Sequence, residues 1–206
     1  MNHIEQLTND IIKEEWRQFD LVNNQGGRAS CQDDWKTFEI MRKSQFSHWP
    51  EELLSSYFYD LAKASLSGRN LMTEKYGRMM ESTAPAEYEK LKNYFPWRSE
   101  ERIERQEKII AIQVSWNEAV SAQYPNFRKQ GRPIHTSEDT PWDTSFETYL
   151  RGEMSTWSDQ TFALYEQWIQ TLLEEGKNLE KITAEKMVQA YGYESLAHAE
   201  EMLGKR

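Results

Sequence analysis

The sequence has little cysteine, little histidine and no long apolar run, and each shortage argues against a class of protein. The single cysteine cannot form an internal disulfide, which fits a reducing compartment. None of the four histidines stands in a His-x-x-x-His pair or three residues after a glutamate, so we find no heme, di-iron or zinc signature. No segment approaches the roughly 20 apolar residues that span a bilayer. The first ten residues also lack the basic and apolar regions of a secretory signal, so we expect a cytoplasmic protein.

Basic residues are also scarce. The 25 lysines and arginines stand against 34 aspartates and glutamates, which gives a formal net charge of −9. Nucleic acid needs a concentrated positive face. The densest charged stretch, residues 98–108, alternates in sign, and that pattern is typical of a solvated helix face. We therefore expect no nucleic-acid partner, and we predict that residues 98–108 face solvent.

Linker-like segments are missing as well, since no tract is rich in proline, glycine or serine. A single domain over residues 1–206 is the simplest interpretation. Aromatic residues, in contrast, are abundant: eight Trp, ten Tyr and eight Phe make up 13% of an otherwise polar chain. Because each aromatic ring buries a large area, the composition predicts an aromatic-rich core.

Apolar residues recur at helical spacing and nowhere alternate over a sustained stretch, so the pattern predicts an all-α fold of roughly eight to ten helices. The longest predicted loop is 124–140, which contains two prolines and a glycine. The pattern allows the third helix to continue beyond Ser67-Gly68. The helices are expected at about 4–22, 30–46, 50–81, 85–95, 99–123, 144–154, 158–175, 183–191 and 194–203.

Three polar segments contain more charged, amide and glycine residues than a helix surface needs, and the first is 26–34. Its double glycine leads into an expected helix N-terminus, where free N–H groups and the helix dipole favour an anion. Arg28 would add a bidentate contact, and Cys31 would lie where a thiolate is favoured. The alternative is a capped turn with two acids that complement the dipole. We favour the turn for Cys31 and keep both interpretations for Arg28.

The second segment is 68–80. Asn70, Glu74 and Arg78 fall on one helix face, either as an exposed ion-pair ladder or as a polar stripe that lines a pocket. Gly77 within this helix costs about 1 kcal/mol relative to alanine. Close approach of another element or of a ligand would explain that glycine, which favours the pocket slightly.

The third segment is 138–153. Thr144 and Glu147 match a capping box, which needs no further function. Capping does not explain Arg151 or Glu153 on a helix that also carries Gly152. An acid held by an arginine is a candidate acid/base or substrate clamp, and neither interpretation is favoured here.

These segments also resemble a known family. The strings are Gly-Gly-Arg-Ala-Ser-Cys-Gln-Asp-Asp (26–34), Met-Arg-Lys-Ser-Gln-Phe (41–46), Gly-Arg-Asn-Leu-Met-Thr-Glu-Lys-Tyr (68–76) and Thr-Ser-Phe-Glu-Thr-Tyr-Leu-Arg-Gly-Glu (144–153). They are similar to an uncharacterised bacterial family, the domain-of-unknown-function family "forty-one twenty-five". The resemblance covers nearly the whole chain. It implies a stand-alone domain of about this length and no particular activity.

Two classes of function fit these features. In the first, the chain is a small-molecule enzyme or binding protein with an Arg/Glu-lined polar pocket, because arginines clamp carboxylates and phosphates. The candidate catalytic residues are Glu147, Glu74 and Cys31. The candidate ligand-binding residues are Arg28, Gln32, Asp33, Glu39, Arg42, Arg69, Asn70, Arg78, Arg151 and Glu153.

In the second class, the chain is a helical adaptor or accessory subunit. This hypothesis predicts a contiguous exposed aromatic patch for a protein partner and no deep pocket. The sequence leaves open whether the chain is an enzyme. A carboxylate-only Mg²⁺ or Mn²⁺ site from Asp33, Asp34, Glu74 or Asp143 is also open.

Overall fold

A computed structural model describes residues 2–24 and 26–205. Over these residues the chain forms α-helices and short 3-10 helices, with no strand, which confirms the predicted all-α fold. The α-helices are α1 (His3–Asp20), α2 (Trp35–Phe46), α3 (Glu51–Leu66), α4 (Leu71–Thr83), α5 (Pro85–Leu91), α6 (Glu100–Gln123), α7 (Pro125–Arg128), α8 (Phe146–Met154), α9 (Asp159–Glu174), α10 (Leu179–Ala190) and α11 (Leu196–Gly204). The 3-10 helices are η1 (Ser30–Asp33), η2 (Lys92–Tyr94) and η3 (Thr136–Glu138).

Most helices begin at a short polar side chain that accepts a hydrogen bond from a backbone N–H three residues later, as N-caps do. These caps move several predicted starts. Asp34 caps α2, so the residues from Ser30 form η1 instead of the first turn of α2. Ser145 caps α8 in place of the expected Thr144, and Asn178 starts α10 before the expected position 183.

Two features raise the number of helices above the expected eight to ten. Gly68 has φ +72°, a left-handed conformation that glycine adopts readily, so it ends α3 and separates it from α4. The amide of Arg69 then donates to the carbonyl of Ala64, 2.8 Å away, which closes the end of α3. In addition, the expected loop 124–140 contains α7 and η3.

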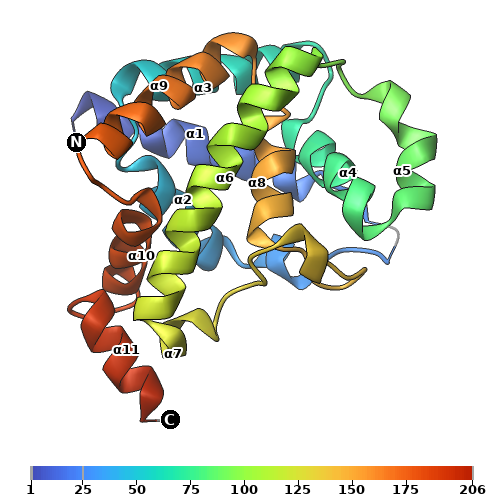
Figure 1. Ribbon diagram of the computed structural model, residues 1–206. Coiled ribbons are helices and arrows are strands. Elements are labelled where there is room, and N and C mark those ends of the chain that lie inside the picture. Colours follow the sequence, from blue (N-terminus) through green and yellow to red (C-terminus); the bar gives the residue numbers. More distant parts are fainter. Residues whose placement is uncertain (1, 25, 206) are drawn as a thin grey trace.

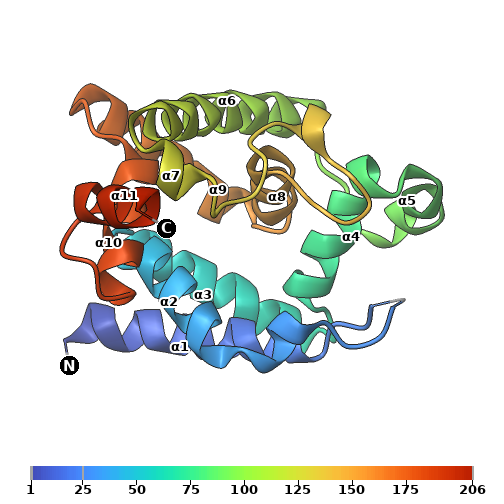
Figure 2. The ribbon, with the colours of Figure 1, turned by 90° about the horizontal axis from the view of Figure 1, so that it is seen from below.

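The helices pack in two groups with a third set between them. Figure 2 shows α1, α2 and α3 on one side and α6 on the opposite side, with α8 and α9 between them. Helices α4 and α5 lie at one end, and α7, α10 and α11 lie at the other (Figure 1). Helix α9 contacts both α3 and α6, and α4 contacts α1 and α8, which in turn contacts α6. The two sides are therefore joined through α9 and through α4 and α8.

The main core is rich in aromatic rings, as the composition predicts. The ring of Trp49 lies 4.9 Å from that of Phe46 and 5.6 Å from that of Trp157, measured between centroids. Tyr165 lies 4.9 Å from Trp157, and all four side chains are buried. A second, smaller core joins the end of α6 to α7, α10 and α11 around Val188. Within the described residues, no helix is long and apolar enough to cross a membrane.

Candidate functional site

Arg42 occupies the centre of a buried ionic network. From α2 it donates to Glu15 in α1 through two nitrogens, and to Glu153 in α8 at 2.8 Å. Lys75 in α4 lies 4.0 Å from Glu153 and donates to the hydroxyl of Tyr149 at 2.9 Å. This network joins two predicted site residues, Arg42 and Glu153, to two that the sequence analysis did not select, Glu15 and Lys75.

The charges in this network balance, since two cations face two carboxylates. Burial alone would raise the pKa of Glu153, but Arg42 and Lys75 beside it lower the pKa to about 2. Burial and the neighbouring carboxylates keep the pKa of Tyr57 well above its usual value, and its hydroxyl donates to Glu15 at 2.6 Å. The two carboxylates and Lys75 are at most a few per cent exposed. We interpret this buried, balanced network as a contact that joins helices.

Gly152 is explained by the same junction. A Cβ at this position would lie 2.7 Å from Cγ of Met79 and 3.0 Å from the carbonyl oxygen of Lys75. Helix α8 therefore needs glycine here so that α4 can approach closely. At Gly77, the space that a Cβ would need is filled by the ring of Phe95. Both glycines reflect close approach of another part of the chain.

The first predicted segment forms a surface turn. Arg28 is exposed, and its guanidinium pairs with Asp20 at 2.6 Å and with Asp33 at 2.8 Å. Gln32 is buried and donates to the carbonyls of Phe19 and Val22, so it caps the end of α1. Cys31 is exposed within η1. These contacts give Arg28 and Gln32 roles in closing the turn.

The third predicted segment holds the loop before α8. Arg151 pairs with Glu147 at 2.8 Å and with Glu107 of α6 at 2.7 Å. Burial raises the pKa of Glu147, but the amide of Thr136, the largest opposing contact, and Arg151 lower it overall. Glu147 accepts the Thr136 amide at 2.8 Å, so the pair fastens η3 to α8.

Two other predicted residues lie apart from these networks. Asn70 caps α4 by accepting from Thr73, and its side chain donates to the carbonyl of Gln18 at 2.7 Å. Glu39 is half-buried on α2 and lines a surface hollow of about 620 Å³ together with Lys43 and other residues. The predicted residues therefore meet in several networks and not in one pocket.

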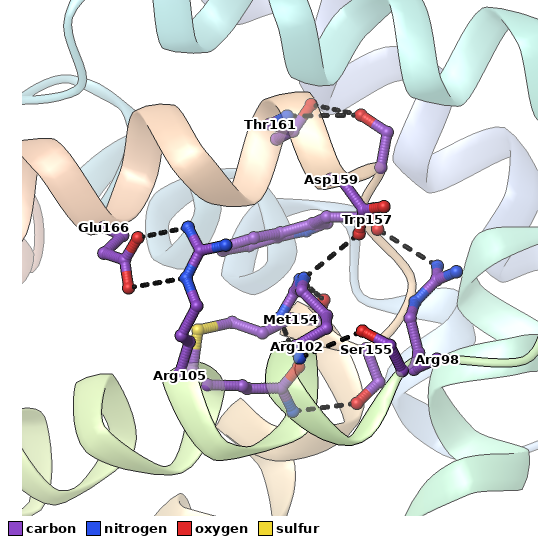
Figure 3. Close-up of polar contacts among 12 residues, drawn as sticks. Arg98, Arg102, Arg105, Met154, Ser155, Trp157, Asp159, Thr161 and Glu166 are labelled. Carbon is purple, nitrogen blue, oxygen red and sulfur yellow. Dashed lines mark hydrogen bonds and ion pairs between the residues drawn. The ribbon is translucent and has the colours of Figure 1, made fainter.

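Three arginines lie close together, and one of them, Arg98, is near enough to the other two to lower the pKa of each. They are Arg78 in α4, Arg98 just before α6 and Arg102 in α6, and we call them the arginine cluster. Figure 3 shows Arg102 reaching the last residue of α8, Met154, and Arg98 reaching Trp157 in the segment that follows. Arg98 donates to the carbonyl of Trp157 at 3.0 Å, and Arg102 donates to that of Met154 at 3.1 Å.

The arginine cluster is incompletely neutralised. All three Nε atoms are buried, and none has a hydrogen-bond acceptor among the described residues. The cluster's one ion pair within the described chain joins Nε of Arg102 to Asp159 at 3.4 Å, and that carboxylate is 84% exposed. Burial, followed by the nearby Arg98, lowers the pKa of Arg102 to about 10, so it stays charged at neutral pH. Burial also lowers the pKa of Arg78 and of Arg98.

Part of this arrangement has a purely structural explanation. Met154 ends α8, and carbonyls at a helix C-terminus attract cationic donors. The next arginine of α6, Arg105, is neutralised by Glu166 through contacts of 3.2 and 2.5 Å (Figure 3). Helix capping accounts for Nη2 of Arg102, and Nη1 donates to the side-chain oxygen of Gln106 at 3.0 Å. The three Nε–H groups of the cluster remain without hydrogen-bond acceptors among the described residues.

Two further predicted residues adjoin the arginine cluster. Arg69 holds Glu74 through two contacts of 2.8 Å, and the charge of Glu74 acts on both Arg78 and Arg98. The sequence predicted one shared face for Asn70, Glu74 and Arg78. In the structure the charge of Glu74 acts on Arg78, whereas Asn70 caps α4.

The prediction that residues 98–108 face solvent is wrong at Arg102 and Gln106, which are 4% and 3% exposed. They are buried because the end of α8 packs on that face of α6, where Gln106 donates to the carbonyl of Arg151. The signal was present in the sequence: Arg102, Gln106, Ile109 and Gln113 recur every three or four residues, so they share one helix face.

No group of three or more His, Cys, Asp or Glu side chains within residues 2–24 and 26–205 is arranged to hold a metal ion. Three of the four carboxylates considered for magnesium or manganese have other partners, and the fourth, Asp143, is exposed. Asp33 pairs with Arg28, Asp34 caps α2, and Glu74 pairs with Arg69.

The structure therefore defines an all-helical domain with a balanced ionic core and a separate, unbalanced arginine cluster. A family described as a protein of unknown function, DUF4125, matches residues 5–201, and the chain belongs to that family. This confirms the resemblance drawn from the sequence strings. Comparison with curated proteins and with solved structures gives no match.

Proposed function

We propose that the arginine cluster binds a small anion with a carboxylate or phosphate group, and that the chain is a small-molecule binding protein or enzyme. The observation that carries the proposal is the set of three buried Nε–H groups without acceptors, on Arg78, Arg98 and Arg102. Each buried donor left unsatisfied costs about 1–3 kcal/mol. An anion that accepts from these donors would remove that cost and neutralise the excess charge.

Arginine suits this role for geometric reasons. Its planar guanidinium presents donors in a fixed fork that matches carboxylate and phosphate oxygens. One terminal nitrogen of Arg98 and one of Arg102 already donate to backbone carbonyls, which orients both side chains before a ligand arrives. Such preorganisation favours affinity because less side-chain freedom is lost on binding.

A catalytic role would centre on Glu74. Its carboxylate is held by Arg69, and its charge acts on Arg78 and Arg98, which supports Glu74 as the group that would exchange a proton with a bound anion. The other candidate catalytic residues lie outside the arginine cluster. Glu147 accepts the amide of Thr136, and Cys31 is exposed in η1. We therefore assign the acid or base of any reaction at this site to Glu74.

The test measures thermal stability in phosphate, in sulfate and in citrate, each against sodium chloride at matched ionic strength. A ligand that binds only the folded state adds about 2.7 kcal/mol of stability at about 100 times its Kd. We expect at least one of the three anions to raise the Tm of the unmodified protein and to lose that effect in Arg98→Gln.

The matched control is Arg105→Gln, on the same helix as Arg102, because Glu166 already neutralises Arg105. It should leave the response to anions unchanged. Arg98 is preferred over Arg102 as the test position because it is only half-buried. An equal anion response in Arg98→Gln and in the unmodified protein would contradict the proposal, as would no response to any of the three anions.

Docking of a protein partner is a second proposal, supported by exposed aromatic rings. Tyr94 and Trp97 are 83% and 80% exposed, and both precede Arg98. Large exposed aromatic side chains are common at protein interfaces. In this case Trp97→Ala would abolish co-purification of a stoichiometric partner, whereas Trp142→Ala, also at a highly exposed ring, would not.

A further inference from the structure

A second candidate site lies at the other end of the molecule from α4 and α5. It is a groove of about 680 Å³ between the C-terminal part of α6, α7, α10 and α11, which lie together in Figure 1. Its walls are mostly apolar and include Phe127, Met187 and Tyr191. Pockets that bind small organic molecules commonly have this size and lining.

Three charged residues line the groove: Arg128 of α7, Arg132 of the following loop and Glu180 of α10. The other elements that line it, α2, the end of α6, α8 and α11, contribute only uncharged side chains, such as Asn117. Within the described residues, no carboxylate lies within ion-pair distance of Arg128 or of Arg132. The groove therefore has two guanidinium groups without an ionic partner.

The guanidinium of Arg128 lies at the wall of the groove, close to the backbone of Gly131. A Cβ built on Gly131, which also lines the groove, would lie 3.2 Å from its Nη1 atom. Arg132 is committed elsewhere, since it donates to the carbonyl of Thr144 at 2.9 Å and stacks 4.4 Å from the ring centroid of Tyr149. Arg128 is therefore the group that can pair with an incoming anion.

Glu180 does not oppose such an anion at neutral pH. Burial raises its pKa to about 8, and a hydrogen bond from Asn117 only partly offsets that rise. The carboxyl group therefore keeps its proton at neutral pH and adds no negative charge to the groove. At higher pH it ionises and repels a bound anion.

We propose that this groove binds an amphipathic organic carboxylate, with its apolar body against Phe127, Met187 and Tyr191 and its carboxylate paired with Arg128. The charge of the lining selects this class over an amine or a neutral lipid, and the apolar walls select it over an inorganic anion. The site is separate from the arginine cluster, so either proposal can fail without the other.

The experiment compares three probes with the same eight-carbon chain: octanoate, octan-1-ol and octylammonium. Dissociation constants are measured on the unmodified protein by amide chemical shifts at neutral pH. We expect octanoate to bind most tightly, octanol less tightly and octylammonium least, with shifts at residues of α7 and α10. Equal affinity for all three, tightest binding of octylammonium, no binding, or shifts confined to other parts of the chain would overturn the proposal.

The variants test the assigned residues. Arg128→Gln should remove the preference for octanoate over octanol, while Lys129→Gln, at the exposed neighbouring cation, should keep it. The unmodified protein should lose octanoate affinity several-fold above the pKa of Glu180, and Glu180→Gln should not. An unchanged preference in a folded Arg128→Gln protein would show that another group selects the probe, and it would contradict the assignment.

Discussion

The guanidinium of Arg42 in α2 binds both oxygens of Glu153 in α8, a residue 111 positions further along the chain, at 2.8 and 3.4 Å. The same guanidinium binds Glu15 of α1, so three helices depend on one side chain. Removing one partner of a buried ion pair leaves a charge without compensation. The stability of the network therefore depends on every one of its charged members.

We predict that Arg42→Ala destabilises the protein by about 3–5 kcal/mol, as loss of one member of a buried pair does. Urea denaturation followed by circular dichroism measures the change. Lys90→Ala is the matched control, because Lys90 pairs with Glu87 on an exposed surface and such pairs contribute about 0–1 kcal/mol. Similar losses in the two variants would show that the buried network contributes little.

The same network predicts acid sensitivity. The pKa of Glu153 is lowered to about 2 in the folded protein, and that of Glu14 is also about 2, chiefly because of its hydrogen bond to Arg17. A depressed pKa stabilises the fold above the unfolded-state value and ceases to do so as pH falls towards the folded value. Stability should therefore fall between about pH 4.5 and pH 2.

Urea midpoints measured through that range test this prediction, and Glu153→Gln provides the comparison. The variant should be less stable than the unmodified protein at neutral pH, with a shallower decline in acid. A variant that follows the unmodified curve in parallel would show that Glu153 is not the titrating group.

For Glu180 we predict the opposite dependence of stability on pH, because its pKa is raised in the folded protein. Burial raises its pKa to about 8, so the folded state holds a proton that the unfolded state releases above its own, lower pKa. The stabilisation from protonated Glu180 is complete below the pKa that this carboxyl has in the unfolded chain. It is lost as the pH rises to about 8. Glu180→Gln should therefore gain stability relative to the unmodified protein between mildly acidic and alkaline pH. The exposed Glu174→Gln serves as the control, and equal behaviour of the two variants would contradict the assignment.

Gly152 predicts a packing defect. In Gly152→Ala the new methyl group meets Cγ of Met79 and the backbone oxygen of Lys75, which cannot move freely. Overpacking costs typically about 1–3 kcal/mol, against a gain in helix propensity of about 1 kcal/mol. We expect a net loss of stability in thermal unfolding. Gly26→Ala, where a Cβ meets nothing within 4 Å, should be close to neutral, and an equally neutral Gly152→Ala would contradict the close approach.

The candidate sites could be predicted only in part from the sequence. Spacing placed Glu74 and Arg78 on one helix face, and the structure brings both near Arg98. The alternating charges of residues 98–108, in contrast, suggested a solvated face. They gave no indication that α8 ends against Arg102 and supplies it with a carbonyl. Likewise, nothing in the order of residues marks Glu180, whose raised pKa arises from burial alone.

The sequence by itself determined the helical fold class, the aromatic core and the family, because helical periodicity, side-chain size and local strings are all properties of neighbouring residues. Only the tertiary structure decided which charges are paired. Arg28 pairs with Asp20 and Asp33, which are close to it in the sequence. Arg42 instead pairs with Glu153, which is far from it in the sequence and lies on another helix. Ion pairing and desolvation depend on distances in space, and those are set only when helices far apart in the chain pack together.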